Sequence, residues 1–318
     1  MKALDTPKLS TLQEVFGPSV GGSEPMDVPI FGESTVEHKP LELADDLVRV
    51  LYYFLIAGSD HGLWLHGPTG CGKTYTVQQF FGRLGLPIVR INVKDVEFEE
   101  LTGRYELIDG NTRFVQSAMV DVFECGGIII LDEVANMSPD LVEPFFPMLE
   151  GDNLTLVRDN GRVVERHPFC RIIGTANTSG QSADMKNYLG AKRQSTAFLD
   201  RWSFHAMKSM SQEAEVRSVM AHLELPDNAL TLVEEIVSVA RAVRGASKLE
   251  NSGGEVNFTL SSRVVERWVK AAITFSDLDG HIKLGLHYAV AARLTDDELQ
   301  FLEKTCITIM GHETYEGV

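Results

Sequence analysis

The sequence predicts an α/β fold in which helices cover both faces of a parallel sheet, followed by a smaller helical domain. Apolar runs rich in Ile, Leu and Val alternate with helical patterns over the first two thirds of the chain. Parallel strands are buried on both faces and need crossover connections, so they lack the polar alternation of a half-exposed strand. We expect strands at 63–66, 87–93, 127–133, 170–177 and 202–207.

The composition is that of a globular protein with a substantial core. The chain has 318 residues, 44% of them hydrophobic. Its apolar runs, such as 51–58, are far shorter than the roughly 20 residues that span a bilayer. The N-terminus has no apolar signal segment, so we expect a cytoplasmic protein with no membrane partner.

The charge balance argues against non-specific binding to polyanions. Lys and Arg number 29 against 45 Asp and Glu, which gives a formal net charge of −16. Such a chain is not attracted as a whole to nucleic-acid phosphates or anionic membranes. The four cysteines are spaced singly, and the nine histidines show no HExxH pattern. We therefore expect reduced thiols and no structural metal site.

Three parts follow each other along the chain. Residues 1–40 are dense in Gly, Pro and Ser and predict a loop-rich arm. Residues 41–207 form the α/β core, and the turn pairs Asp109-Gly110 and Asn160-Gly161 predict two inserted hairpins. Residues 208–318 predict a helical domain, because apolar residues there recur at helical spacing. The two clearest faces are Val233, Ile236, Val237, Ala240 and Val243, and Val264, Val265, Trp268, Ala271, Ala272 and Phe275.

The stretch GPTGCGKT at 67–74 fits the pattern GxxxxGK[ST], the phosphate-binding loop of P-loop NTPases. Its glycines let backbone amides close around phosphate oxygens at a helix N-terminus, Lys73 would contact the outer phosphates, and the Thr74 hydroxyl could ligate Mg²⁺. Cys71 occupies a variable position, where we expect an inert thiol. The nucleotide-binding residues are predicted to be Gly67, Pro68, Thr69, Gly70, Cys71, Gly72, Lys73 and Thr74.

The stretch IIILDE at 128–133 supplies two acidic residues at the end of a buried strand. Ligands of α/β sheets bind at the carboxyl ends of the strands. Asp132 would hold Mg²⁺, and Glu133 would orient and deprotonate the attacking water. Together with the glycine loop, this pair predicts an αβα nucleotide hydrolase.

From about residue 45 to 275, these motifs resemble the AAA+ ATPases, and more narrowly their MoxR-like branch with the CobS and CbbQ/NorQ group. The resemblance implies ATP and Mg²⁺, and a C-terminal domain that acts as a lid. It makes Asn177 the polar sensor, Arg201 the arginine finger for a neighbouring subunit, and Arg263 the sensor arginine of the lid. The alternatives are a strand-end cap for Asn177 and surface arginines for the other two. Hairpins of such proteins line a ring's face or pore, against the alternative of plain loops.

Two stretches depart from the family pattern. Pro144 and Pro147 lie inside an expected helix, which should therefore be kinked or broken. In GAKRQSTAFLDR, Lys192 and Arg193 are rival candidates for the finger.

The resemblance implies a homo-oligomeric ring, expected to be a hexamer, that hydrolyses ATP to remodel or activate a partner protein. By analogy the partner would be a von Willebrand factor A-type protein, and the outcome metal chelation or metalloenzyme maturation. The competing function is the motor of a nucleic-acid-processing system of restriction or phage-like type, which the charge of −16 disfavours. A third is a scaffold that binds ATP with little turnover.

Overall fold

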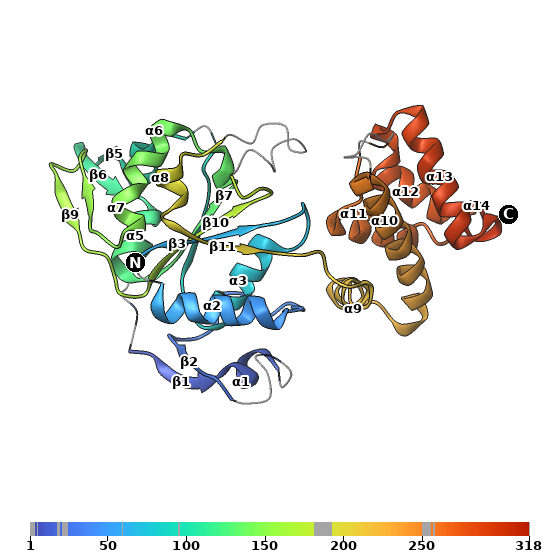
Figure 1. Cartoon of the computed structure of the whole chain (residues 1–318), viewed down its shortest axis with the longest axis horizontal. Coiled ribbons are helices and arrows are strands. Elements are labelled where there is room, and N and C mark those ends of the chain that lie inside the picture. The colour runs from blue at the N-terminus through green and yellow to red at the C-terminus, as the bar shows by residue number, and fades with distance from the viewer. Residues whose placement is uncertain are drawn as a thin grey trace. The chain divides into compact units, whose positions relative to one another are not determined.

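The chain forms two compact units in a computed structural model (Figure 1). The structure describes residues 4, 6–17, 20, 25–58, 60–94, 96–180, 193–249, 256 and 258–317. The first unit comprises residues 1–68 and 72–208, and the second comprises residues 209–318 with the loop residues Thr69–Cys71. Within the described ranges, no helix combines the length and apolarity that crossing a bilayer requires.

The first unit is built on a five-stranded parallel sheet, as the sequence predicts. The strand order is β11-β3-β10-β7-β4. Its strands are β3 (Gly62–His66), β4 (Ile88–Asn92), β7 (Gly127–Asp132), β10 (Cys170–Ala176) and β11 (Trp202–Ala206). The order places β10 between β3 and β7, so the ends of all three strands meet at one edge of the sheet.

Helices cover both faces of this sheet (Figure 1). On one face lie α2 (Asp45–Ala57) and α3 (Lys73–Arg83). On the other, Ile129, Leu131 and Ile172 of the strands share a buried cluster with α5 (Ala118–Cys125) and with residues 134–149. The alternate residues Ile128 and Ile130 are fully buried too. Burial on both faces explains why these strands are apolar throughout.

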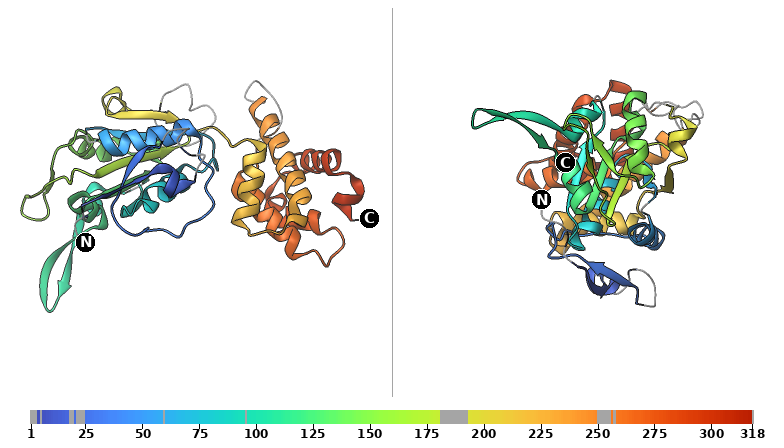
Figure 2. Two further views of the ribbon diagram at one scale, coloured as in Figure 1. Left: turned by 90° about the horizontal axis from the view of Figure 1, so that it is seen from below. Right: turned by 90° about the vertical axis from the view of Figure 1, so that its left-hand side faces the viewer.

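Two hairpins extend the core, as predicted (Figure 2). After the short helix α4 (Phe98–Thr102), the strands β5 (Gly103–Ile108) and β6 (Asn111–Gln116) pair around Asp109 and Gly110. Both turn residues have positive φ, as a two-residue hairpin turn requires. The second hairpin pairs β8 (Leu154–Leu156) with β9 (Arg162–Val164). The Tyr105 hydroxyl donates a hydrogen bond to the Arg158 backbone oxygen and so joins the hairpins.

The proline-containing segment is broken, as predicted. After η1 (Val134–Asn136), the chain forms α6 (Pro139–Val142), η2 (Glu143–Phe145) and α7 (Phe146–Leu149) in place of one helix. Pro144 and Pro147 each lie in the first turn of a new piece, where a missing N–H does no harm. The helix α8 (Thr196–Leu199) then precedes β11.

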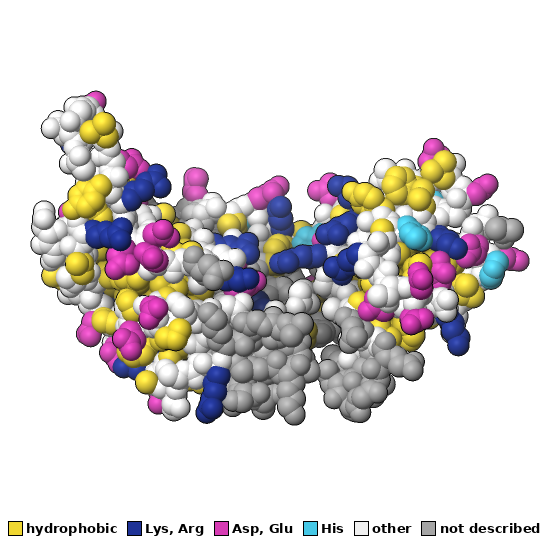
Figure 3. Space-filling model, turned by 90° about the horizontal axis from the view of Figure 1, so that it is seen from above, with side chains coloured by type: hydrophobic (Ala, Val, Ile, Leu, Met, Phe, Trp, Pro, Cys, Tyr) yellow, Lys and Arg dark blue, Asp and Glu magenta, His cyan; other side chains and the backbone are white. Residues whose placement is uncertain are grey.

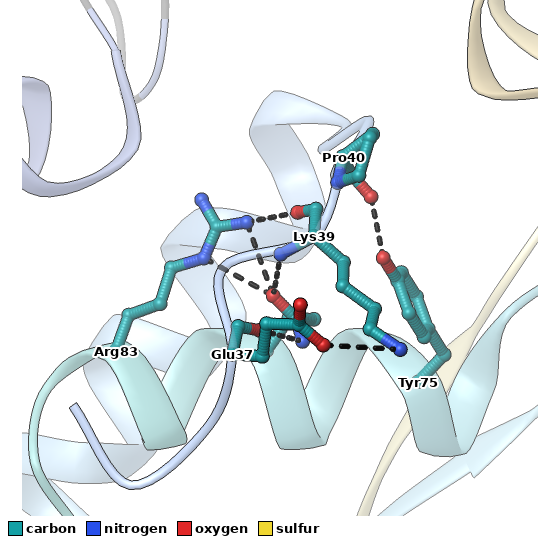
Figure 4. A network of polar contacts seen from close by, with 6 residues as sticks. Glu37, Lys39, Pro40, Tyr75 and Arg83 are labelled. Carbon is teal, nitrogen blue, oxygen red and sulfur yellow. Dashed lines mark hydrogen bonds and ion pairs between the residues drawn. The ribbon is translucent and has the colours of Figure 1, made fainter. Parts of the chain in front are cut away.

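The N-terminal segment contains more regular structure than its composition indicates. β1 (Lys8–Thr11) and β2 (Asp27–Ile30) pair in antiparallel fashion around α1 (Leu12–Phe16). Residues 31–40 then run along α3, where the Gln79 side chain donates to Glu37 O and accepts from Lys39 N (Figure 4). At the same helix, the Tyr75 hydroxyl donates to Pro40 O at 2.5 Å. The segment after β2 is therefore fixed to the helix that follows the glycine loop.

The second unit is helical. The residues of the two predicted faces are buried there, and Val233 and Trp268 are both 0% exposed. The exception is Phe275, which is only half-buried. The Trp268 indole N–H donates to Ile282 O at 2.9 Å and so ties two helices together. The elements are α9 (Gln212–His222), η4 (Asp227–Ala229), α10 (Leu230–Leu249), α11 (Ser262–Thr274), α12 (His281–Ala289), η6 (Ala291–Arg293), α13 (Asp296–Met310) and α14 (His312–Glu316).

Candidate nucleotide site

The glycine loop connects β3 to α3. Gly67, Gly70 and Gly72 have φ of 155°, 83° and 89°, values that side chains rarely tolerate. Gly72 is the N-cap of α3 and supplies no side-chain cap. The N-terminus of α3 therefore offers backbone N–H groups and a positive dipole end where a phosphate would lie. Cys71 of the same loop is buried.

Lys73 is the first residue of α3, and its ammonium group reaches back to the loop. Lys73 Nζ donates to Gly67 O at 2.8 Å, to Pro68 O at 3.0 Å and to Asn177 Oδ1 at 3.1 Å. Asn177 directly follows β10, the strand next to β3. The sheet order thus brings the predicted loop lysine and the predicted sensor together.

Asp132 is the centre of a second set of contacts, at the end of β7. Its carboxylate is 8% exposed, and Oδ1 accepts hydrogen bonds from the hydroxyls of Thr74 at 2.8 Å and Thr175 at 2.5 Å. A hydroxyl and a carboxylate are the hard oxygen donors that Mg²⁺ prefers. The donor set at Thr74 and Asp132 therefore fits the predicted metal.

Two residues at this site, Arg90 and Thr175, are not evident from the motifs. Arg90 lies on β4 and donates through Nε to Asp132 Oδ2, as an ion pair. The signal in the sequence is a single charged residue in the middle of the apolar run PIVRINV. For Thr175 the signal is weaker, since one threonine in a buried strand is common.

Glu133 is placed differently from Asp132, although it is the next residue. Its side chain is exposed, and its Oε2 accepts from Asn136 Nδ2 at 3.1 Å. Its backbone has φ 59°, a left-handed conformation that non-glycine residues adopt at a cost. The strand end thus directs one carboxylate into the sheet edge and leaves the other open to solvent.

The finger candidates differ in their surroundings. Arg201 precedes β11, is 23% exposed, and stacks on Phe146 with 3.9 Å between its guanidinium carbon and the ring centroid. It also forms an ion pair with Glu150 at 2.5 Å. Arg193 is exposed and lines an open surface hollow of about 620 Å³ with Met137 and Phe146. Lys192 lies outside the described residues.

Arg263 lies in the second unit, exposed on the first turn of α11. That turn is held by a buried ion pair: Arg244 donates to both oxygens of Glu215 at 2.7 and 2.8 Å, and Glu215 is 1% exposed. Ser262, next to Arg263, donates to the same carboxylate at 2.9 Å. The backbone that carries Arg263 is therefore anchored within its own unit.

Comparison with known proteins identifies the domain that contains these residues. Residues 62–201, from β3 to the start of β11, match the AAA domain of the dynein-related subfamily. Residues 62–201 are therefore an AAA-type ATPase domain, and the chain is similar to the MoxR-like ATPases. The matched segment of this ATPase contains the glycine loop, the acidic pair, both hairpins and Arg201.

Three curated relatives of the ATPase are 27–31% identical to it. The cobaltochelatase subunit CobS from a Sinorhizobium species is 27% identical over 234 residues, which cover 70% of this chain and 69% of CobS. The protein CbbQ of Hydrogenophilus thermoluteolus is 31% identical over 43% of this chain and 52% of its own length. The protein NorQ of Paracoccus denitrificans is 27% identical over 78% of this chain and 86% of its own length.

Proposed function

We propose that this ATPase binds ATP with Mg²⁺ at the glycine loop, works as a homo-oligomeric ring in the cytoplasm, and remodels or activates a partner protein. One observation carries the site: Lys73, Asn177, Thr74 and Asp132 converge from three strand ends. In this proposal Gly67–Thr74 hold the phosphates, and Thr74 and Asp132 hold the metal. When bound, Mg²⁺ would neutralise charge on the outer phosphates.

The chain's own residues have distinct tasks in this proposal. Lys73 exchanges the carbonyl oxygens of Gly67 and Pro68 for phosphate oxygens. Glu133, which is exposed and hydrogen-bonded by Asn136, orients the attacking water and accepts its proton. Asn177 positions that water or the outer phosphate. Arg201 or a neighbouring cation contacts the phosphate of the adjacent subunit. Arg263 acts as the sensor arginine of the helical lid, residues 208–318.

The partner is proposed from the relatives and from the hairpins. CobS is named as a subunit of a cobaltochelatase, which makes metal chelation or metalloenzyme maturation the favoured role. A von Willebrand factor A-type protein as partner follows only from the resemblance to the MoxR-like branch. Hydrophobic side chains lie along the projecting β5–β6 hairpin (Figure 3). Leu107 is 76% exposed there, and Val157 on the second hairpin is 81% exposed. Such residues suit a protein contact better than a contact with nucleic acid.

The first test is the ATPase rate per chain against protein concentration, with Mg²⁺, in the presence and absence of duplex DNA. We expect the rate to rise with assembly and to ignore DNA at physiological salt. Stimulation by DNA would indicate that the protein is a nucleic-acid motor, with the same residues assigned to the nucleotide site. Nucleotide binding without turnover at any protein concentration would instead support the alternative function, a scaffold that binds ATP with little turnover.

A further inference from the structure

The Asp132 carboxylate is paired in this structure with a positively charged side chain, the Arg90 guanidinium. Oδ1 accepts the two hydroxyls of Thr74 and Thr175, while Oδ2 is paired with the Arg90 guanidinium. All the hydrogen bonds described for this carboxylate therefore come from side chains around the predicted metal position. The Thr74 hydroxyl, the other predicted ligand, is directed at Asp132 as well.

The burial of the two partners differs strongly. Asp132 is 8% exposed, so its negative charge would be costly without a compensating group. Arg90 is 53% exposed, and it lies on β4, the end strand in the described sheet order. A side chain with that exposure can leave the carboxylate and keep its charge in water. Leaving the contact therefore costs Arg90 itself little, whereas Asp132 stays buried and needs another cation in its place.

A divalent cation between Thr74 and Asp132 changes the balance of charge around Arg90. The carboxylate is then compensated by the metal, and a guanidinium on Oδ2 becomes a like-charged neighbour of that metal. The two cations compete for one carboxylate. A group that binds only the metal-free state stabilises that state and lowers metal affinity by the same factor.

We propose that Arg90 is a positioning residue that holds and neutralises Asp132 when no metal is bound, and that is displaced when the metal enters with the nucleotide. This inference rests on the proposed function, because it takes Asp132 as the metal-holding carboxylate. It assigns Arg90 to the regulation of metal affinity and not to direct contact with phosphate.

The test compares Arg90→Met, which keeps the stem and removes the charge, with Arg104→Met as matched control. Arg104 is an exposed arginine on β5 that pairs with Glu106, outside the nucleotide site. Thermal unfolding is measured without nucleotide in EDTA. Binding of Mn²⁺ is measured by electron paramagnetic resonance in the full chain saturated with ADP, where no turnover occurs.

We expect Arg90→Met to unfold a few degrees lower in EDTA and to half-saturate with Mn²⁺ at a concentration roughly two- to tenfold lower than wild type. Arg104→Met should change neither value. Arg90→Lys, which keeps the charge and loses the planar fork, should fall between wild type and Arg90→Met.

Three outcomes overturn the inference. Unchanged unfolding and unchanged Mn²⁺ binding in Arg90→Met would show that the Arg90–Asp132 ion pair is a surface contact with no effect on the metal. Weaker Mn²⁺ binding would show that Arg90 supports the metal. Weaker binding of ADP in EDTA would show that Arg90 contacts phosphate. If wild type binds no Mn²⁺ with ADP, the proposed metal site itself fails, and that result is distinguishable from the other three.

Discussion

Lys73 Nζ lies 3.1 Å from Asn177 Oδ1, although the two residues are 104 positions apart in the chain. The contact forms because β3, which leads into the loop, and β10, which ends before Asn177, are neighbours in the sheet. It connects the cation of the glycine loop to the predicted sensor.

Lys73→Ala should weaken ATP binding by roughly a hundredfold, because charge-assisted hydrogen bonds contribute about 1.5–3 kcal/mol each. Equilibrium dialysis or a fluorescent ATP analogue measures the change. Lys304→Ala, at an exposed position of α13, removes the same charge elsewhere and should bind normally. An unchanged dissociation constant in Lys73→Ala would remove the loop from the phosphate site.

Glu133→Gln should bind ATP normally and lose turnover by roughly 10²- to 10⁴-fold, because an amide cannot accept the proton of the attacking water. Single-turnover hydrolysis and ATP binding are measured on the same preparation. The control is Glu143→Gln, an exposed glutamate of η2. Hydrolysis near the wild-type rate would exclude Glu133 as the base.

Arg201→Ala should keep nucleotide affinity and lose the part of the hydrolysis rate that depends on protein concentration. Rescue in mixed assemblies with Glu133→Gln would show action across the subunit interface. If Arg193→Ala or Lys192→Ala has this phenotype and Arg201→Ala does not, the substituted residue is the one that acts as the finger.

Arg201 also packs on Phe146 and pairs with Glu150, so its loss has a structural component of about 1 kcal/mol. Glu150→Gln removes the ion pair alone and separates the two effects. Loss of assembly-dependent hydrolysis in Glu150→Gln would indicate that Arg201 acts by supporting its own subunit.

Arg171→Met should destabilise the first unit by about 2–4 kcal/mol, because several backbone carbonyl groups lose a charged hydrogen-bond donor. Arg171 is 2% exposed on β10, and it donates to Phe54 O at 2.8 Å and to Leu55 O at 2.5 Å near the end of α2. Burial lowers its pKa to about 10, so the charge persists at neutral pH. Urea unfolding measures the loss, and Arg104→Met should unfold as wild type does.

Acidification should destabilise the first unit partly through His167. Burial, assisted by the charge of Arg171, holds the His167 pKa below its usual value of 6.5. Between the folded and unfolded pKa values the unfolded chain binds more protons, so this contribution is present above about pH 6.5 and is lost as the pH falls. His167→Gln should reduce the fall in unfolding midpoint between pH 7 and pH 5. An unchanged slope would assign the acid sensitivity to other groups.

The sequence predicts the parts of this molecule that depend on short, strong patterns. The five strands follow from apolar runs, the two hairpins from Asp109-Gly110 and Asn160-Gly161, and the broken helix from Pro144 and Pro147. Each of these signals acts within a few residues. They also placed the glycine loop before a helix and the acidic pair at a strand end.

The structural features that could not be predicted from the sequence depend on contacts between distant segments. β1, α1 and β2 are short, and they owe their order to packing: Phe16 stacks on Phe80 of α3 with 4.9 Å between centroids. The Arg90 contact with Asp132 spans 42 residues and exists only because β4 and β7 are neighbours. A motif scan along the chain has no access to either relationship.

The strand order also constrains synthesis of the chain. β3 precedes the glycine loop, yet its two neighbours, β10 and β11, emerge from the ribosome more than 100 residues later. Until Ala206 has been translated, one edge of β3 has no strand to pair with. Residues 62–66 therefore depend on collapse against α2 and α3, or on chaperones, to avoid aggregation during translation. Truncated products that end before Cys170 should accordingly lack a formed phosphate loop.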